Sequence, residues 1–124
     1  MNTKRILIID DEADICEIAK TSLEITEQWD VLIAMSGEEG LAIAVSTQPD
    51  AILLDVVMPE CDGLATLGKL KSDPVTRAIP VIMLTAIVNL AVQRQCAELN
   101  SKAILIKPFD PGILGKQIAK ILDW

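Results

Sequence analysis

The chain has 124 residues, of which 51% are apolar, and this is enough to build the core of one domain over residues 1–124 without disulfides. Its formal net charge of -7, with scattered rather than clustered basic side chains, argues against nucleic-acid binding by this chain alone. Because it contains no histidine, Ser-His-Asp and Cys-His catalysis are excluded, and so is a phosphohistidine on this chain.

The cysteines and the apolar runs bear on where the protein works. The three cysteines are far apart and contain no C-x-x-C pair, so neither a disulfide framework nor a zinc cluster is indicated. No apolar run is long enough for a signal peptide or a membrane span. We therefore expect a cytoplasmic protein that makes no membrane contact.

Five short apolar runs, each bounded by polar or turn residues, predict buried β-strands. In chain order they are Arg5 to Ile9, Trp29 to Ala34, Ala51 to Leu54, Val81 to Leu84 and Ala103 to Ile106. Apolar residues with helical spacing follow each of these runs. The chain therefore consists of five consecutive strand–helix units joined by short loops.

Local signals mark several helix ends. Ser36 followed by Glu39 is a capping box that opens the second helix. Asp110 followed by Pro111 predicts the start of the last helix, which we expect to run from Asp110 to Trp124. Asn100 is a candidate left-handed residue at the end of the fourth helix.

Strands that are apolar throughout and alternate with helices are typical of a parallel sheet covered on both faces. The sequence thus predicts an α/β, flavodoxin-like (βα)5 fold with a five-stranded parallel sheet in the order 2-1-3-4-5. Ligands of such sheets bind beyond the carboxyl ends of the strands, beside the point where the strand order reverses. Functional side chains should therefore be sought directly after the strands.

Polar, chemically capable residues stand at four of these five ends. Asp10 and Asp11 follow the first strand, and Asp55 follows the third. Because the first and third strands are neighbours in the predicted order, these carboxylates should crowd together and repel one another unless a cation lies among them. Oxygen ligands favour Mg²⁺, with Mn²⁺ also possible. Thr85 and Lys107 follow the fourth and fifth strands and could donate to a transferring phosphoryl group on Asp55.

Each residue alone also has a simpler interpretation. Asp10 or Asp11 could cap the first helix, and Asp55 could be a solvated acid at a strand end. Thr85 could be an ordinary strand residue and Lys107 a surface lysine. Their shared position at one end of the sheet favours a joint site.

Four linked segments resemble the receiver domain of two-component response regulators, and the similarity extends over essentially the whole chain. They are Ile8 to Glu12, Leu53 to Gly63, Leu84 to Ala86 and Ile106 to Phe109. Each segment alone is weak, but four in this order and at these spacings are specific. The resemblance implies a single-domain, chemotaxis-receiver-like phosphoprotein of a phosphorelay.

The resemblance also implies roles for the site residues. Asp55 would be the phosphoryl acceptor, Asp11 and Asp55 direct Mg²⁺ ligands together with the Val57 carbonyl, and Asp10 a ligand acting mainly through water. Thr85 would move toward the phosphoryl group, and Lys107, whose bond to Pro108 is often cis in the family, would pair with it. The surface of the fourth helix, fifth strand and fifth helix would then change.

By the same resemblance, the phosphoryl donor would be a histidine kinase or a histidine phosphotransfer protein, and the output would pass to a protein target that the sequence does not name. The chain would catalyse only its own phosphorylation and dephosphorylation, as a monomer or weak dimer. The main alternative is a phosphorylation-independent, receiver-like interaction module. A haloacid-dehalogenase-like phosphatase is disfavoured because Val57 stands where its second Asp is expected, and a flavodoxin is disfavoured by the scarcity of aromatic residues.

Overall fold

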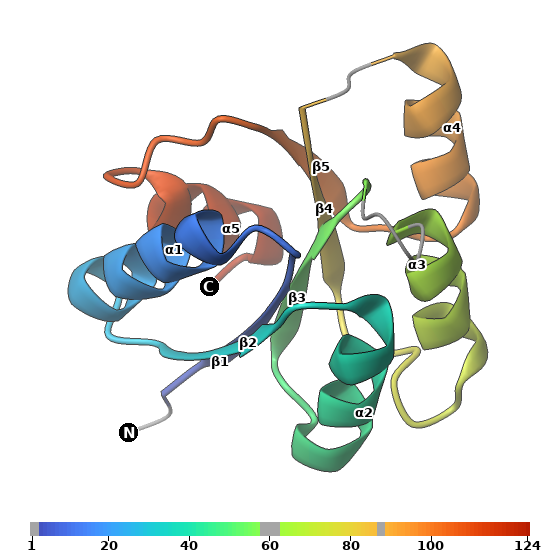
Figure 1. Ribbon diagram of the computed structural model, residues 1–124, viewed down its shortest axis with the longest axis horizontal. Helices are drawn as coiled ribbons and strands as arrows, with labels where there is room; N and C mark the ends of the chain where they lie inside the picture. Colours follow the sequence, from blue (N-terminus) through green and yellow to red (C-terminus); the bar gives the residue numbers. More distant parts are fainter. Residues whose placement is uncertain (1–2, 58–62, 87–88) are drawn as a thin grey trace.

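The computed structural model describes residues 3–57, 63–86 and 89–124, and five strands within them form one parallel sheet. The sheet order is β2-β1-β3-β4-β5 (Figure 1). The strands are β1 (Arg5–Ile9), β2 (Asp30–Ala34), β3 (Ala51–Asp55), β4 (Val81–Thr85) and β5 (Ala103–Ile106). The predicted fold class and strand order are confirmed.

Helices cover both faces of this sheet. They are α1 (Ala13–Thr26), α2 (Gly37–Thr47), α3 (Gly63–Ser72), α4 (Leu90–Glu98) and α5 (Leu114–Leu122). Helices α1 and α5 lie side by side on one face, and α2, α3 and α4 lie on the other (Figure 1). Among the described residues, no helix is both long and apolar enough to cross a membrane.

The two faces of the sheet carry separate apolar cores because successive side chains of a strand point to opposite sides. In β1, Ile6 and Ile8 belong to the core beneath α1 and α5, whereas Leu7 and Ile9 belong to the core beneath α2, α3 and α4. All four side chains are essentially inaccessible to solvent. Burial on both faces explains why the strands read as continuous apolar runs rather than alternating ones.

Strands β1 and β5 have the predicted bounds, and each of the other three differs from its predicted bounds by one residue. β2 begins at Asp30 rather than at Trp29, while β3 and β4 extend by one residue to include Asp55 and Thr85. The ladder continues past these residues, since the Val56 N–H donates to the Leu84 carbonyl and the Lys107 N–H to the Thr85 carbonyl. The sheet itself therefore fixes the backbone on which the candidate site residues stand.

The predicted signals for α2 and for the end of α4 are confirmed. Ser36 Oγ accepts a hydrogen bond from the Glu39 N–H at 3.1 Å, and Glu39 Oε1 accepts one from the Met35 N–H at 2.9 Å. Asn100 has a φ of 63°, the left-handed conformation expected beyond a helix end. These local contacts satisfy backbone groups that the helices leave without partners.

The predicted start of the last helix is wrong. α5 begins at Leu114, and Asp110 instead closes the turn before it. Asp110 Oδ1 accepts from the Gly112 N–H at 2.8 Å, and the Asp110 carbonyl accepts from the N–H groups of Ile113 and Leu114. An Asp followed two residues later by a glycine favours such a turn, and glycine is a poor helix former. The helix also ends at Leu122, because Asp123 is left-handed with a φ of 57°.

Candidate functional site

Three carboxylates meet at the carboxyl ends of β1 and β3. The two strands are paired in register, with Ile9 opposite Leu54, so Asp10 and Asp55 follow neighbouring residues of the sheet. One carboxylate oxygen from each of Asp10, Asp11 and Asp55 lies within 4.8 Å of the others. The sequence-based prediction that these three acids converge is confirmed.

Asp10 is held by the loop that leads into α1. Its side chain is fully buried, and its Oδ1 accepts a hydrogen bond from the Glu12 N–H at 3.0 Å. Its backbone N–H donates to the Ala34 carbonyl at 3.0 Å, and its carbonyl accepts from Cys16 Sγ at 3.3 Å. Main-chain and side-chain contacts thus fix the direction in which this carboxylate points.

Lys107 brings a positive charge to the acids from β5, an edge strand of the sheet. It follows β5, and its Nζ lies 2.8 Å from Asp10 Oδ2 and 3.3 Å from Asp55 Oδ2. A third carboxylate oxygen, Glu12 Oε1, lies at 2.9 Å. Burial lowers the pKa of Lys107, but the contacts with Asp10 and Glu12 outweigh burial and raise it above its ordinary value. The side chain is therefore charged at neutral pH. The peptide bond between Lys107 and Pro108 is cis, as the resemblance implied.

Asp55 is a buried acid whose charge is costly. Its pKa is raised from 3.8 to about 6, first because its side chain is removed from solvent and second because Asp10 is close. The Val57 N–H, which donates to Asp55 Oδ1 at 3.2 Å, and the Lys107 ammonium oppose this rise only in part. Any further positive charge beside Asp55 would therefore stabilise its ionised form.

The donor set fits a hard divalent cation. Asp10 Oδ2 is buried and touches the Lys107 ammonium, yet within the described parts of the chain no donor directs a well-aligned hydrogen bond to it. The ligand atoms that converge here are all oxygens, and neither histidine nor cysteine contributes to the group. Oxygen donors of this kind suit Mg²⁺ or Mn²⁺ rather than zinc.

Thr85 and Val57 flank the acids. Thr85 is buried at the end of β4, between β3 and β5, and its carbonyl accepts from the Lys107 N–H at 2.8 Å. Val57 is half exposed at 53% and lies two residues after Asp55, the last residue of β3. Residues 58–62, which complete the resembling segment after Asp55, lie outside the described residues.

Two contacts of the site were not predicted from sequence. Glu12 reaches Lys107 across 95 residues of chain, and Cys16 contacts the Asp10 carbonyl. Glu12 stands next to the acidic pair, which is the signal that could have drawn attention to it. Its contact partner depends on side-chain conformation, which the spacing of residues does not encode.

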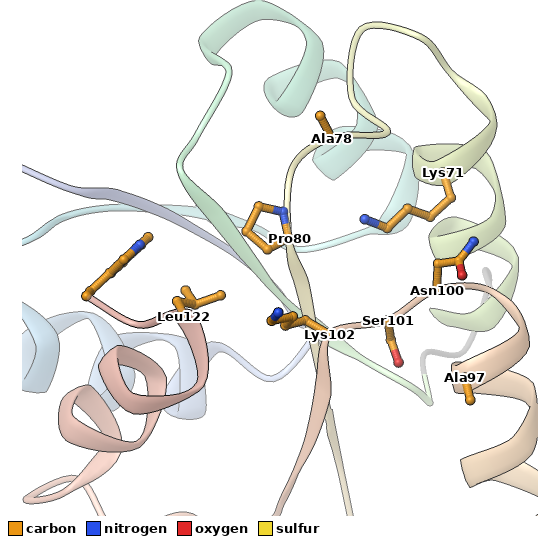
Figure 2. Close-up of a pocket in the computed structure, with 9 residues that line it drawn as sticks. Lys71, Ala78, Pro80, Ala97, Asn100, Ser101, Lys102 and Leu122 are labelled. Carbon is orange, nitrogen blue, oxygen red and sulfur yellow. The ribbon is translucent and has the colours of Figure 1, made fainter.

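A separate cavity of about 580 Å³ opens at the amino ends of β4 and β5, the opposite end of the sheet from the carboxylates. Figure 2 shows Lys71, Asn100 and Lys102 among its lining residues. The Lys71 ammonium donates to the carbonyls of Arg77 and Ile79, so it holds the turn before β4. None of the three clustered acids lines this cavity, and the chemistry of the site lies elsewhere.

The comparison with known families agrees with the geometry. A family model described as "Response regulator receiver domain" matches residues 6–119. RpaA of Synechocystis sp., a "DNA-binding dual master transcriptional regulator", is 41% identical over 106 residues, which are 86% of this chain and 44% of that protein. The response regulator PleD of Caulobacter vibrioides is 38% identical over 117 residues, which are 94% of this chain and 26% of PleD. The chain thus spans less than half the length of these curated relatives.

Solved structures give the same result. The chemotaxis protein CheY4 of Vibrio cholerae superimposes with a TM-score of 0.91 at 25% sequence identity, covering 97% of this chain and 99% of CheY4. The match therefore extends over nearly the full length of both chains. Sheet order, clustered acids and family model agree, and the chain belongs to the receiver domain family of two-component response regulators.

Proposed function

We propose that Asp55 accepts a phosphoryl group from a phosphohistidine of a histidine kinase or histidine phosphotransfer protein. The observation that carries this proposal is the meeting of three carboxylates within 4.8 Å, with the Lys107 ammonium 3.3 Å from Asp55 Oδ2. A buried carboxylate beside a fixed positive charge is suited to attack phosphorus and to remain bound as an acyl phosphate. The chain has no histidine, so the phosphohistidine belongs to the partner.

In the transfer step, an Asp55 carboxylate oxygen forms a bond to phosphorus while the bond from phosphorus to the imidazole nitrogen breaks. The electron pair of the broken bond stays on the imidazole. Lys107 neutralises charge on the transferring group, and the Thr85 hydroxyl donates to one of its oxygens as Thr85 moves toward it. Asp55 must be ionised to attack, and a carboxyl group with a pKa of about 6 is mostly ionised at neutral pH.

The carboxylates of Asp11 and Asp55 and the carbonyl of Val57 would hold Mg²⁺, or Mn²⁺ in its place, with Asp10 contributing mainly through water. Bound there, the cation offsets negative charge on the transferring group and on the carboxylates. The chemistry of the donor set supports this assignment, since three crowded acids with one lysine retain excess negative charge.

The signal would leave through the surface formed by α4, β5 and α5. Leu90, Ile106 and Ile113 expose apolar side chains in this region. A protein target that binds the phosphorylated and unphosphorylated conformations with different affinity would read the state of Asp55. In this role the chain acts in the cytoplasm as one domain, a monomer or weak dimer, and catalyses only its own phosphorylation and dephosphorylation.

The test is incubation with acetyl phosphate and Mg²⁺, followed by intact mass and site mapping. We expect one added phosphoryl group, a gain of about 80 Da on the one acceptor carboxylate. Label should be absent in Asp55→Asn and after chelation of Mg²⁺. Asp14→Asn, which removes an exposed acid of α1, should label like the wild type.

Labelling, together with a target-binding measurement, distinguishes this function from a phosphorylation-independent interaction module. A folded wild-type protein that takes no label at Asp55 from acetyl phosphate or from a phosphorylated histidine kinase would contradict the proposed transfer. A target that binds wild type and Asp55→Asn equally, with and without phosphodonor, would favour the module.

A further inference from the structure

Three carboxylates surround the Lys107 ammonium. An ammonium group has three N–H donors. Three carboxylate oxygens lie around Nζ, from Asp10 at 2.8 Å, Glu12 at 2.9 Å and Asp55 at 3.3 Å. Glu12 Oε1 also accepts a hydrogen bond from the ammonium, so a phosphoryl oxygen that pairs with Lys107 competes with this carboxylate for an N–H donor.

The burial of the three side chains indicates which carboxylate separates most easily from the Lys107 ammonium. The side chains of Asp10 and Asp55 are 0% and 5% exposed, so separating either from the ammonium would leave a buried charge with less compensation. The Glu12 side chain is 55% exposed, so water can solvate its carboxylate once the contact with Lys107 is broken. Glu12 is the partner that is exchanged most readily.

We propose that Glu12 is a positioning residue that holds the Lys107 ammonium until the arriving phosphoryl group takes its place. This inference rests on the proposed function of Asp55. The Glu12 carboxylate occupies Lys107 in the resting protein and adds negative charge at the exposed side of the site. The negative charge of Glu12 repels a phosphodonor more strongly the more negative that phosphodonor is. Glu12 therefore makes the site selective for phosphodonors of low charge.

The local structure allows this residue to be changed without loss of the fold. Glu12 is the N-cap of α1, but its side chain makes no capping hydrogen bond. Only its backbone carbonyl is used there, as the acceptor for the Cys16 N–H at 3.1 Å. Glu12→Gln keeps the length of the side chain and removes its charge, leaving these backbone bonds in place.

The experiment compares two small donors at saturating Mg²⁺ and low donor concentration. Acetyl phosphate is a dianion at neutral pH, whereas phosphoramidate carries one net negative charge. We expect Glu12→Gln to raise the initial rate of Asp55 labelling about fivefold with acetyl phosphate and about twofold with phosphoramidate, because the repulsion scales with donor charge. Both gains should shrink at high salt, since Glu12 is exposed to screening ions.

Asp14→Asn is the matched control, because Asp14 is an exposed acid in the first turn of α1 and contributes none of the carboxylates around Lys107. It should leave the ratio of the two rates unchanged. A merely structural role for Glu12 would alter both rates by one common factor. Equal factors for the two donors, or an equal change of the ratio in Asp14→Asn, would overturn the inference.

The outcomes also separate this inference from the function on which it rests. If the wild type takes no label at Asp55 from either donor, the phosphoryl-acceptor function itself fails. If the wild type is labelled and Glu12→Gln has the same donor ratio, only the role of Glu12 fails.

Discussion

Asp55 combines a functional requirement with a cost in stability. Its carboxyl pKa is raised from 3.8 to about 6 by burial and by the charge of Asp10. A raised pKa means that the folded state holds the proton more tightly than the unfolded state does. Stability from this group is fully present below pH 3.8 and is lost as the pH rises through about 6. Above that pH the ionised acid destabilises the resting fold.

We therefore expect Asp55→Asn to be more stable than the wild type at pH 8 in buffer without divalent cations. The shift in pKa corresponds to a gain of about 1 to 3 kcal/mol in the free energy of unfolding. The difference between the two proteins should narrow toward pH 4. Urea unfolding at both pH values measures it, with Asp14→Asn as the charge-matched control. A wild type that is the more stable protein at pH 8 would refute the expectation.

At the scale of secondary structure, the strands and their carboxyl ends were predictable from sequence. Apolar runs such as Val81 to Leu84 are buried on both faces of the sheet, so hydrophobicity alone marks them. Once the strand order is known, Asp10 and Asp55 must be neighbours, because β1 and β3 pair in parallel. The convergence of the three acids follows from topology and needs no side-chain detail.

Local competition between turn and helix was not predictable in the same way. Asp110 can cap a helix or close a turn. Gly112 favours the turn, and its N–H donates to Asp110 Oδ1, so α5 begins only at Leu114. The contact between Glu12 and Lys107 depends on the conformations of two long side chains from opposite ends of the chain. Residue spacing carries no information of that kind.

Helix α3 offers a test of how tightly the elements around the acceptor strand pack. A Cβ on Gly63 would lie 2.8 Å from Val56 Cα and nearer still to the Asp55 carbonyl oxygen. These are backbone atoms of the strand end and cannot move aside cheaply. Gly63→Ala should therefore lower the free energy of unfolding by about 2 kcal/mol.

Gly68 lies in the same helix and provides the control. The nearest atom to a Cβ added there is Leu99 Cδ2 at 3.8 Å, an ordinary van der Waals distance. Gly68→Ala should raise the free energy of unfolding by about 0.5 to 1 kcal/mol, because alanine is the better helix former. Denaturant unfolding of both variants gives the comparison. Equal effects of the two substitutions would show that close packing at Gly63 does not limit stability.

For the molecule as a whole, the site exists only when the sheet is complete. Its acids come from the ends of β1 and β3, and its lysine follows β5 at the other edge. In the unfolded chain these charges are far apart and bind a cation weakly. Folding brings the acids together at the ends of β1 and β3. Part of the charge repulsion in this chain of net charge -7 therefore arises at this site. A divalent cation at this point should therefore bind the folded state and stabilise it.

Thermal unfolding in increasing Mg²⁺ measures this linkage. At a free concentration about a hundredfold above the dissociation constant, the gain in the free energy of unfolding should be about 2.7 kcal/mol. For a domain of this size, that corresponds to a rise of roughly 10 °C in the unfolding midpoint. NaCl at matched ionic strength should not reproduce the rise, because screening does not supply a bound divalent charge. Asp10→Asn and Asp55→Asn should each lose most of it, whereas an equal rise in both variants would place the cation elsewhere on this acidic surface.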